Sequence, residues 1–140
     1  MPPALTIDPA TGALDLDGLI RLAPLSGQAE AAAALAPFIR RGQDFGTGYA
    51  WLYTAGLSFG GSPCWLNLCF RDGCLEMANW SVELAAGESG GMDAEVAFMR
   101  AELGRQLGRA FKAEERFAWG WAWCSCDPRS DIVSSGVRYG

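Results

Sequence analysis

The sequence predicts an α+β fold, an antiparallel β-sheet with two helices packed on one of its faces. Three observations carry this prediction. Most of the chain alternates bulky apolar residues with polar or small ones, at the period of two that is typical of strands. Turn-forming residues, above all Asp72-Gly73, separate these segments. Only the segments near 28–36 and 93–107 have helical composition or spacing.

Composition narrows the class of protein. The 140 residues, half of them apolar, suit one domain over 1–140. The net charge of -5 and the scattered basic residues argue against binding to nucleic acid or acidic membranes. The chain shows no apolar leader or spanning segment, so we expect a cytoplasmic protein. It contains no His, which excludes Ser-His-Asp and Cys-His catalytic arrangements within the chain.

The N-terminal third is expected to hold a hairpin and a helix. Strands Leu5–Ile7 and Leu14–Leu16 flank the turn sequence "DPATG", and a short strand at 19–22 follows. Ser26 is placed to cap the Ala-rich helix, and Pro37 should end that helix near residue 36. The Gly-containing segment 40–48 reads as a loop.

Three strands are expected next, at 49–59, 64–70 and 74–80. A two-residue turn at Asp72-Gly73 pairs Arg71 with Cys74. Further along, this register places Phe70 opposite Leu75, Leu68 opposite Met77, Cys69 opposite Glu76 and Trp65 opposite Trp80. The expected core face is Leu66, Leu68, Phe70, Leu75 and Met77. The other face carries Asn67, Cys69 and Glu76.

The second helix is predicted to begin at a cap on Asp93 and to end at Gly108. Its apolar stripe is Met92, Val96, Met99, Leu103 and Leu107. We expect the two helices to pack on the sheet through Leu35, Val96, Met99 and Leu103.

The segment "FAWGWAWCSCDPRSD" is predicted to be one strand that ends in a turn over 127–130. Its bulky face holds Phe117, Trp119, Trp121 and Trp123, and its small face holds Ala118, Gly120, Ala122 and Cys124. A last strand follows at 132–139. Three Trp residues on one strand face exceed what a small core readily holds, so part of this face should be exposed or at an interface.

These patterns define a candidate binding surface on the sheet face away from the helices. Its residues are Trp119, Trp121, Trp123, Asn67, Cys69, Glu76, Asp127 and Arg129. No catalytic residue or cofactor is expected, because the chain has no His and no catalytic motif. No metal site is expected, because the C-x4-C spacing places Cys64 and Cys69 on opposite strand faces. An acidic chain that binds proteins would suit a basic partner.

Two other classes of protein stay open. A small enzyme would use Cys126 as a thiol nucleophile or Asp127 as a carboxylate at the turn. A structural subunit would bury its Trp-rich strand face in a homodimer.

The two ends of the chain resemble a family of small, uncharacterised bacterial proteins, some of them encoded near polymorphic toxins. The matching text is "LTIDPATGALDLDGLIRLAP" and "FAWGWAWCSCDPRSDIVSSGVRY". The pattern is carried by Trp119, Gly120, Asp127, Pro128, Arg138 and Tyr139. The resemblance implies an immunity-like role, in which the protein binds and blocks a toxin, and it transfers no catalytic residue.

Overall fold

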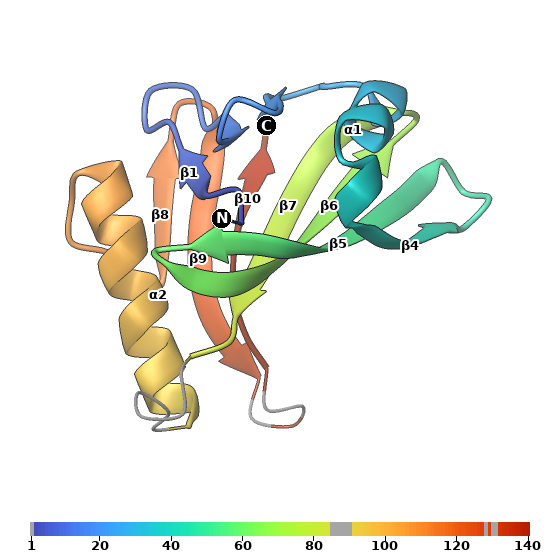
Figure 1. Ribbon diagram of the computed structural model, residues 1–140. Helices are drawn as coiled ribbons and strands as arrows, with labels where there is room; N and C mark the ends of the chain where they lie inside the picture. The colour runs from blue at the N-terminus through green and yellow to red at the C-terminus, as the bar shows by residue number, and fades with distance from the viewer. Residues whose placement is uncertain (1, 85–90, 128, 130–131) are drawn as a thin grey trace.

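The computed structural model describes residues 2–84, 91–127, 129 and 132–140, and these form two antiparallel sheets and two α-helices (Figure 1). The smaller sheet holds β1 (Leu5–Ile7), β2 (Leu14–Leu16) and β3 (Arg21–Leu22). The larger sheet holds seven strands, in spatial order β4 (Ile39–Asp44), β5 (Tyr49–Phe59), β6 (Ser62–Arg71), β7 (Cys74–Val82), β10 (Ile132–Tyr139), β9 (Gly120–Asp127) and β8 (Glu114–Phe117). The helices are α1 (Gln28–Ala34), followed by the 3-10 turn η1 (Ala36–Phe38), and α2 (Met92–Leu107).

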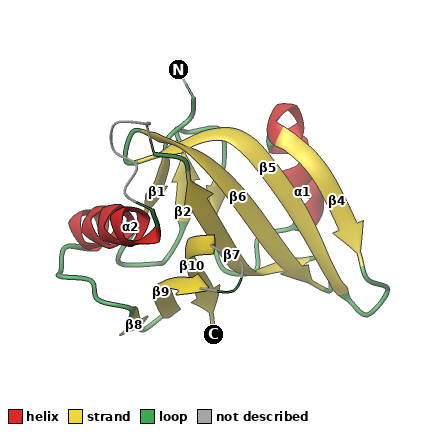
Figure 2. Cartoon of the chain, turned by 90° about the horizontal axis from the view of Figure 1, so that it is seen from below, coloured by secondary structure: helices red, strands yellow, loops and turns green. Residues whose placement is uncertain are grey.

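Both helices and the smaller sheet pack into one hydrophobic core against the larger sheet. Leu35, directly after α1, and Met99 and Leu103 of α2 are fully buried in it, and Val96 packs at its margin. Helix α2 lies beside the β8–β10 end of the sheet, and α1 lies toward the β4–β5 end (Figures 1 and 2). The predicted α+β architecture is therefore confirmed. None of the helices in the described segments is long and apolar enough to cross a membrane.

The helix ends differ in part from the prediction. Gly27, not Ser26, precedes the first turn of α1, because the Ser26 hydroxyl instead accepts a hydrogen bond from the Ala23 amide at 2.8 Å. Helix α2 begins after Gly91, so Asp93 lies inside its first turn, where a carboxylate still favours the helix dipole. Gly108 ends α2 in the left-handed conformation, as predicted.

The β6–β7 hairpin follows the predicted register only near its turn. Arg71 pairs with Cys74 and Phe70 pairs with Leu75, but Cys69 then lies opposite Met77. Glu76 is therefore an extra residue, a β-bulge in β7.

The bulge moves every later side chain of β7 to the other face. The predicted pairs of Leu68 with Met77 and of Cys69 with Glu76 are wrong, since Leu68 lies opposite Ala78. Met77 leaves the core face, and Trp80 enters the core with no exposed surface. Trp65 lies opposite Ser81 rather than Trp80.

Two edge strands were not predicted. Strand β4 occupies the first half of the expected 40–48 loop, and β8 forms the opposite edge of the sheet. The residues of β4 after Ile39 are all exposed. An edge strand of this kind shows no apolar alternation, because only its backbone holds it in the sheet.

The predicted single strand through Phe117 and Trp123 is wrong. Phe117 ends β8, Ala118 and Trp119 form a two-residue turn, and Gly120 opens β9 opposite Phe117. The interior glycine was the signal for this break. Beyond the turn the predicted alternation is right, since Ala122 and Cys124 are buried and Trp121 is half-exposed.

Candidate functional site

The candidate site is the face of the larger sheet that points away from the core, here called the outer face. Cross-strand pairing aligns its side chains in two rows that run from β4 to β8. The first row is Arg41, Tyr53, Asn67, Asn79, Gly136, Trp123 and Glu114. The second row is Gln43, Trp51, Cys69, Met77, Arg138, Trp121 and Arg116.

At the β4–β5 end the outer face holds a stacked aromatic pair. The rings of Trp51 and Tyr53 are 6.0 Å apart with an interplanar angle of 10°. The Arg41 guanidinium lies 4.9 Å from the centre of the Tyr53 ring and donates a 3.0 Å hydrogen bond to Gln43. These contacts hold flat, half-exposed aromatic surface in a defined orientation.

At the β8–β10 end Trp121 lies between two arginines. The guanidinium carbon of Arg116 is 4.8 Å from the Trp121 ring centre, and that of Arg138 is 5.7 Å from it. Arg116 comes from β8 and Arg138 from β10, so the two flanking strands place one cation on each side of the indole.

Trp123 lies close against a neighbouring glycine. A Cβ atom at Gly136, its partner on β10, would fall within 2.5 Å of the Trp123 indole and 2.5 Å from the Ala78 carbonyl oxygen. Only glycine leaves room for the ring here, and the ring in turn covers the backbone of β10 at this residue, which is buried. Trp123 is half-exposed in this position.

Three residues of the predicted binding surface, Asn67, Cys69 and Glu76, lie on the outer face in strands β6 and β7. The Asn67 side-chain amide donates a 2.9 Å hydrogen bond to Asn79 across the β6–β7 pair. Cys69 is buried under its neighbours, and this burial, together with nearby Glu76, raises the pKa of its thiol. Glu76 lies at the bulge, 3.9 Å from the Arg71 guanidinium.

Asp127 and Arg129 lie away from these two rows, at the far end of β9. The Asp127 carboxylate accepts a 2.9 Å hydrogen bond from the Arg129 backbone amide, which is a local turn contact. Cys126 beside them is exposed. The part of the chain that the structure describes holds no cluster of three or more His, Cys, Asp or Glu residues with the arrangement of a metal site.

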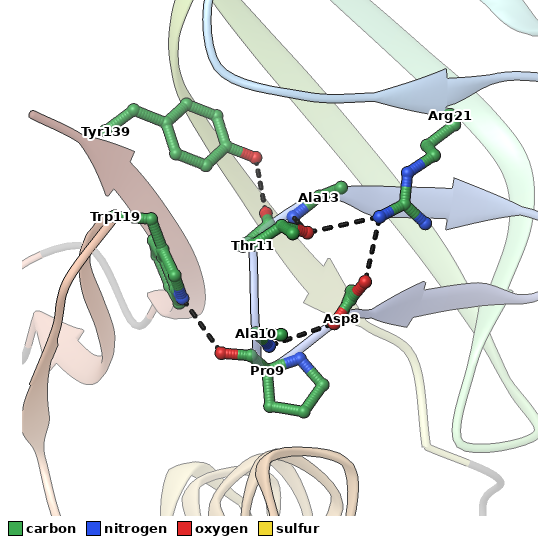
Figure 3. Close-up of polar contacts among 9 residues, drawn as sticks. Asp8, Pro9, Ala10, Thr11, Ala13, Arg21, Trp119 and Tyr139 are labelled. Carbon is green, nitrogen blue, oxygen red and sulfur yellow. Dashed lines mark hydrogen bonds and ion pairs between the residues drawn. The ribbon is translucent and has the colours of Figure 1, made fainter.

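Trp119 does not belong to the outer face. Its indole N–H donates a 3.0 Å hydrogen bond to the Pro9 carbonyl oxygen (Figure 3). Its ring covers Gly12, where an added Cβ would collide with the indole. The Phe117 ring stacks on it at 4.8 Å. Trp119 thus joins the β8–β9 turn to the N-terminal hairpin.

Tyr139 completes this joint from the last strand. Its hydroxyl donates a 2.7 Å hydrogen bond to the Gly12 carbonyl oxygen, and burial raises the pKa of that hydroxyl (Figure 3). The Arg21 guanidinium binds Asp8 on the same hairpin at 2.8 Å and holds the pKa of that carboxyl below its usual range. The motif residues Trp119 and Tyr139, which carry the resemblance at the C-terminus, therefore contact the N-terminal motif "DPATG".

A cavity of about 510 Å³ lies next to the outer face, at the β6–β7 turn. It is lined by Leu25, Arg71, Cys74, Glu76 and Tyr139, among others. Leu25 at its rim is 74% exposed and has a φ of +68°, a conformation that is uncommon for a bulky residue. The Leu25 amide donates a 3.1 Å hydrogen bond to the Leu75 carbonyl oxygen.

Sequence reasoning missed Trp51, Tyr53, Arg116 and Arg138 as members of this surface. Alternation within 49–59 was a signal for the first two, because it places both aromatic rings on one strand face. The two arginines could be placed beside Trp121 only once the pairing of β8, β9 and β10 was known, and no local sequence pattern predicts that pairing. Nothing in the sequence indicated that Leu25 would lie at the rim of the cavity.

We expect iodoacetamide to modify Cys126 before the buried thiols of the native protein. Burial raises the pKa of Cys64 to about 12 and also raises that of Cys124, so little reactive thiolate forms there at pH 8. Peptide mass spectrometry after timed alkylation measures the order. Modification of Cys64 as fast as Cys126 in folded protein would contradict the burial described here.

The α+β fold, with both helices on one side of a large antiparallel sheet, has a counterpart among solved structures. No protein-family model and no curated protein sequence matches the chain. Among solved structures, it is similar to a chain of the structure described as "Rhs1-CT in complex with cognate immunity protein RhsI1". The TM-score is 0.56 at 12% identity, over 96% of this chain and 86% of that chain. The resemblance to immunity-like proteins is thus confirmed at the level of the fold.

Proposed function

We propose that this chain is an immunity-like protein, which binds a toxin through the outer face and blocks its activity. The observation that carries the proposal is the gathering of half-exposed Trp51, Tyr53, Trp121 and Trp123 with arginines on one sheet face. Trp, Tyr and Arg are the residues most enriched where binding energy concentrates in protein interfaces.

The outer face is large enough for such an interface. Seven strands spaced about 4.8 Å apart give a width of about 30 Å. A standard interface covers about 800 Å² on each partner, which a face of this width reaches with a few residues of each strand. The aromatic rings are held by Arg41, Arg116, Arg138 and Gly136, so little side-chain entropy is lost on binding.

The fold similarity to a chain of a toxin–immunity complex supports the same role. The proposal includes a single cytoplasmic domain that acts as a monomer. A homodimer built on the outer face would hide the same aromatic rings. Sedimentation at high concentration distinguishes this homodimer from a monomer that binds a toxin, and we expect a monomer.

Growth rescue tests the proposal. The gene directly upstream of this one in its genome would be expressed in a bacterial host, alone or with this chain. We expect the upstream product to stop growth, this chain to restore it, and the two proteins to elute together. An unrelated acidic protein of similar size is the control. An upstream product that is harmless, or that kills equally well with this chain present, would contradict the proposal.

A further inference from the structure

The outer face carries two cations that the chain itself does not neutralise. Arg116 and Arg138 lie against Trp121, and within the described residues neither guanidinium forms a hydrogen bond or an ion pair. Each guanidinium has five N–H donors in a rigid planar fork. Contact with the indole restrains the orientation of both forks and leaves their donors available to a ligand.

The charge of the outer face is opposite to that of the whole chain. The two rows carry Arg41, Arg116 and Arg138 against Glu114, and the adjoining β6–β7 turn adds Arg71 against Asp72 and Glu76. Among the residues that the structure describes, Arg71 and Glu76 form an ion pair here, 3.9 Å apart, and the arginines around Trp121 have no such partner. The complete chain has a net charge of -5, so its acidic residues are concentrated elsewhere.

We propose that the outer face recognises carboxylates, so that its partner presents an acidic and apolar protein surface to Trp121, Arg116 and Arg138. This inference rests on the proposed function and names the chemistry of the partner. It replaces the basic partner that the net charge suggests with an acidic contact surface. Guanidinium groups bind carboxylates through two parallel hydrogen bonds, and pre-orientation reduces the entropy lost on binding.

Single-stranded RNA is the competing ligand for arginine and exposed aromatic rings on a sheet. The net charge of -5 disfavours it, because phosphate backbones are drawn to basic proteins and repelled by acidic ones. A protein surface with a few carboxylates carries far less negative charge than an RNA backbone. The acidic chain as a whole therefore repels it less, and the arginines beside Trp121 suffice to attract it. RNA binding is therefore included as an outcome of the test.

Titration of the indole N–H resonances by NMR tests the inference. The probes are acetyl-Glu-Leu-Glu-Leu-amide, acetyl-Lys-Leu-Lys-Leu-amide and a uridine hexanucleotide. We expect the acidic peptide alone to shift the Trp121 resonance saturably. Arg116→Gln should weaken this response at least fivefold. Arg40→Gln removes the same charge from β4, at the opposite edge of the sheet, and should leave the response unchanged.

Three results would overturn the inference: no saturable shift with the acidic peptide, an equal shift with the basic peptide, or a stronger shift with the hexanucleotide. Growth rescue is scored separately. A chain that neutralises the upstream toxin but ignores the acidic peptide keeps the proposed function and loses this inference. A chain that binds the peptide through Arg116 but neutralises nothing loses the proposed function alone.

Discussion

Replacing Gly120 by Ala is expected to lower the free energy of unfolding by about 4 kcal/mol, one of the largest losses from a single substitution in this chain. Gly120 opens β9 with a φ of +145°, which L-residues rarely adopt. A Cβ there would collide with the Arg138 carbonyl oxygen and lie 3.0 Å from its carbon. Both atoms belong to the backbone of β10, so a change of rotamer cannot relieve the collision.

Urea unfolding of the Gly120→Ala protein measures this loss. Gly18→Ala is the matched control, since Gly18 has a φ of +77° but no atom within 4 Å of its added Cβ. The control gives the conformational cost of a left-handed φ without a steric collision, about 1–2 kcal/mol. Equal losses in the two variants would show that Gly120 is needed only for its backbone angle and that β10 does not approach it closely.

Replacing Trp119 by Ala is expected to cost about 3 kcal/mol of stability. The substitution removes the ring that covers Gly12, the stacking on Phe117 and the hydrogen bond to Pro9. The contacts with Pro9 and Gly12 join segments more than a hundred residues apart in the chain, so the N-terminal hairpin should become the first part of the protein to exchange its amide hydrogens.

Trp65→Ala is the matched comparison for Trp119→Ala. Trp65 is 43% exposed on β6, and its removal should cost less than about 1 kcal/mol. Thermal unfolding of both variants gives the difference. If Trp119→Ala kept full stability but lost binding of the upstream protein, Trp119 would be a binding residue rather than the joint between the chain ends.

Local sequence signals explain which elements could be predicted. The Asp72-Gly73 turn determines the hairpin at its tip, because few other residue pairs adopt the required positive φ angles. The bulge at Glu76 has no such signal, since it arises from pairing across several strands, and it displaced Met77 and Trp80 from their predicted faces. Strand β4 was missed for a related reason: neighbouring backbone, not its own side chains, makes it a strand.

The candidate surface was predictable only within single strands. Alternation along β9 placed Trp121 and Trp123 together on one face. Whether Trp119 joined them depended on the turn before Gly120, which alternation alone cannot detect. The arginines beside Trp121 come from two other strands, so their role emerged only from the sheet order.

The central claim is that the outer face binds the partner, and calorimetric titration of the upstream protein into Trp51→Ala/Trp121→Ala tests it most directly. This double variant removes the two indoles of the second row, which lie one position in from each of its ends. Leu19→Ala, an exposed apolar residue at the β2–β3 turn, is the control. The account predicts a Kd at least about 100-fold weaker for the folded double variant and unchanged for the control, as expected when two hot-spot residues are lost. An unchanged Kd in the double variant would show that the partner binds elsewhere.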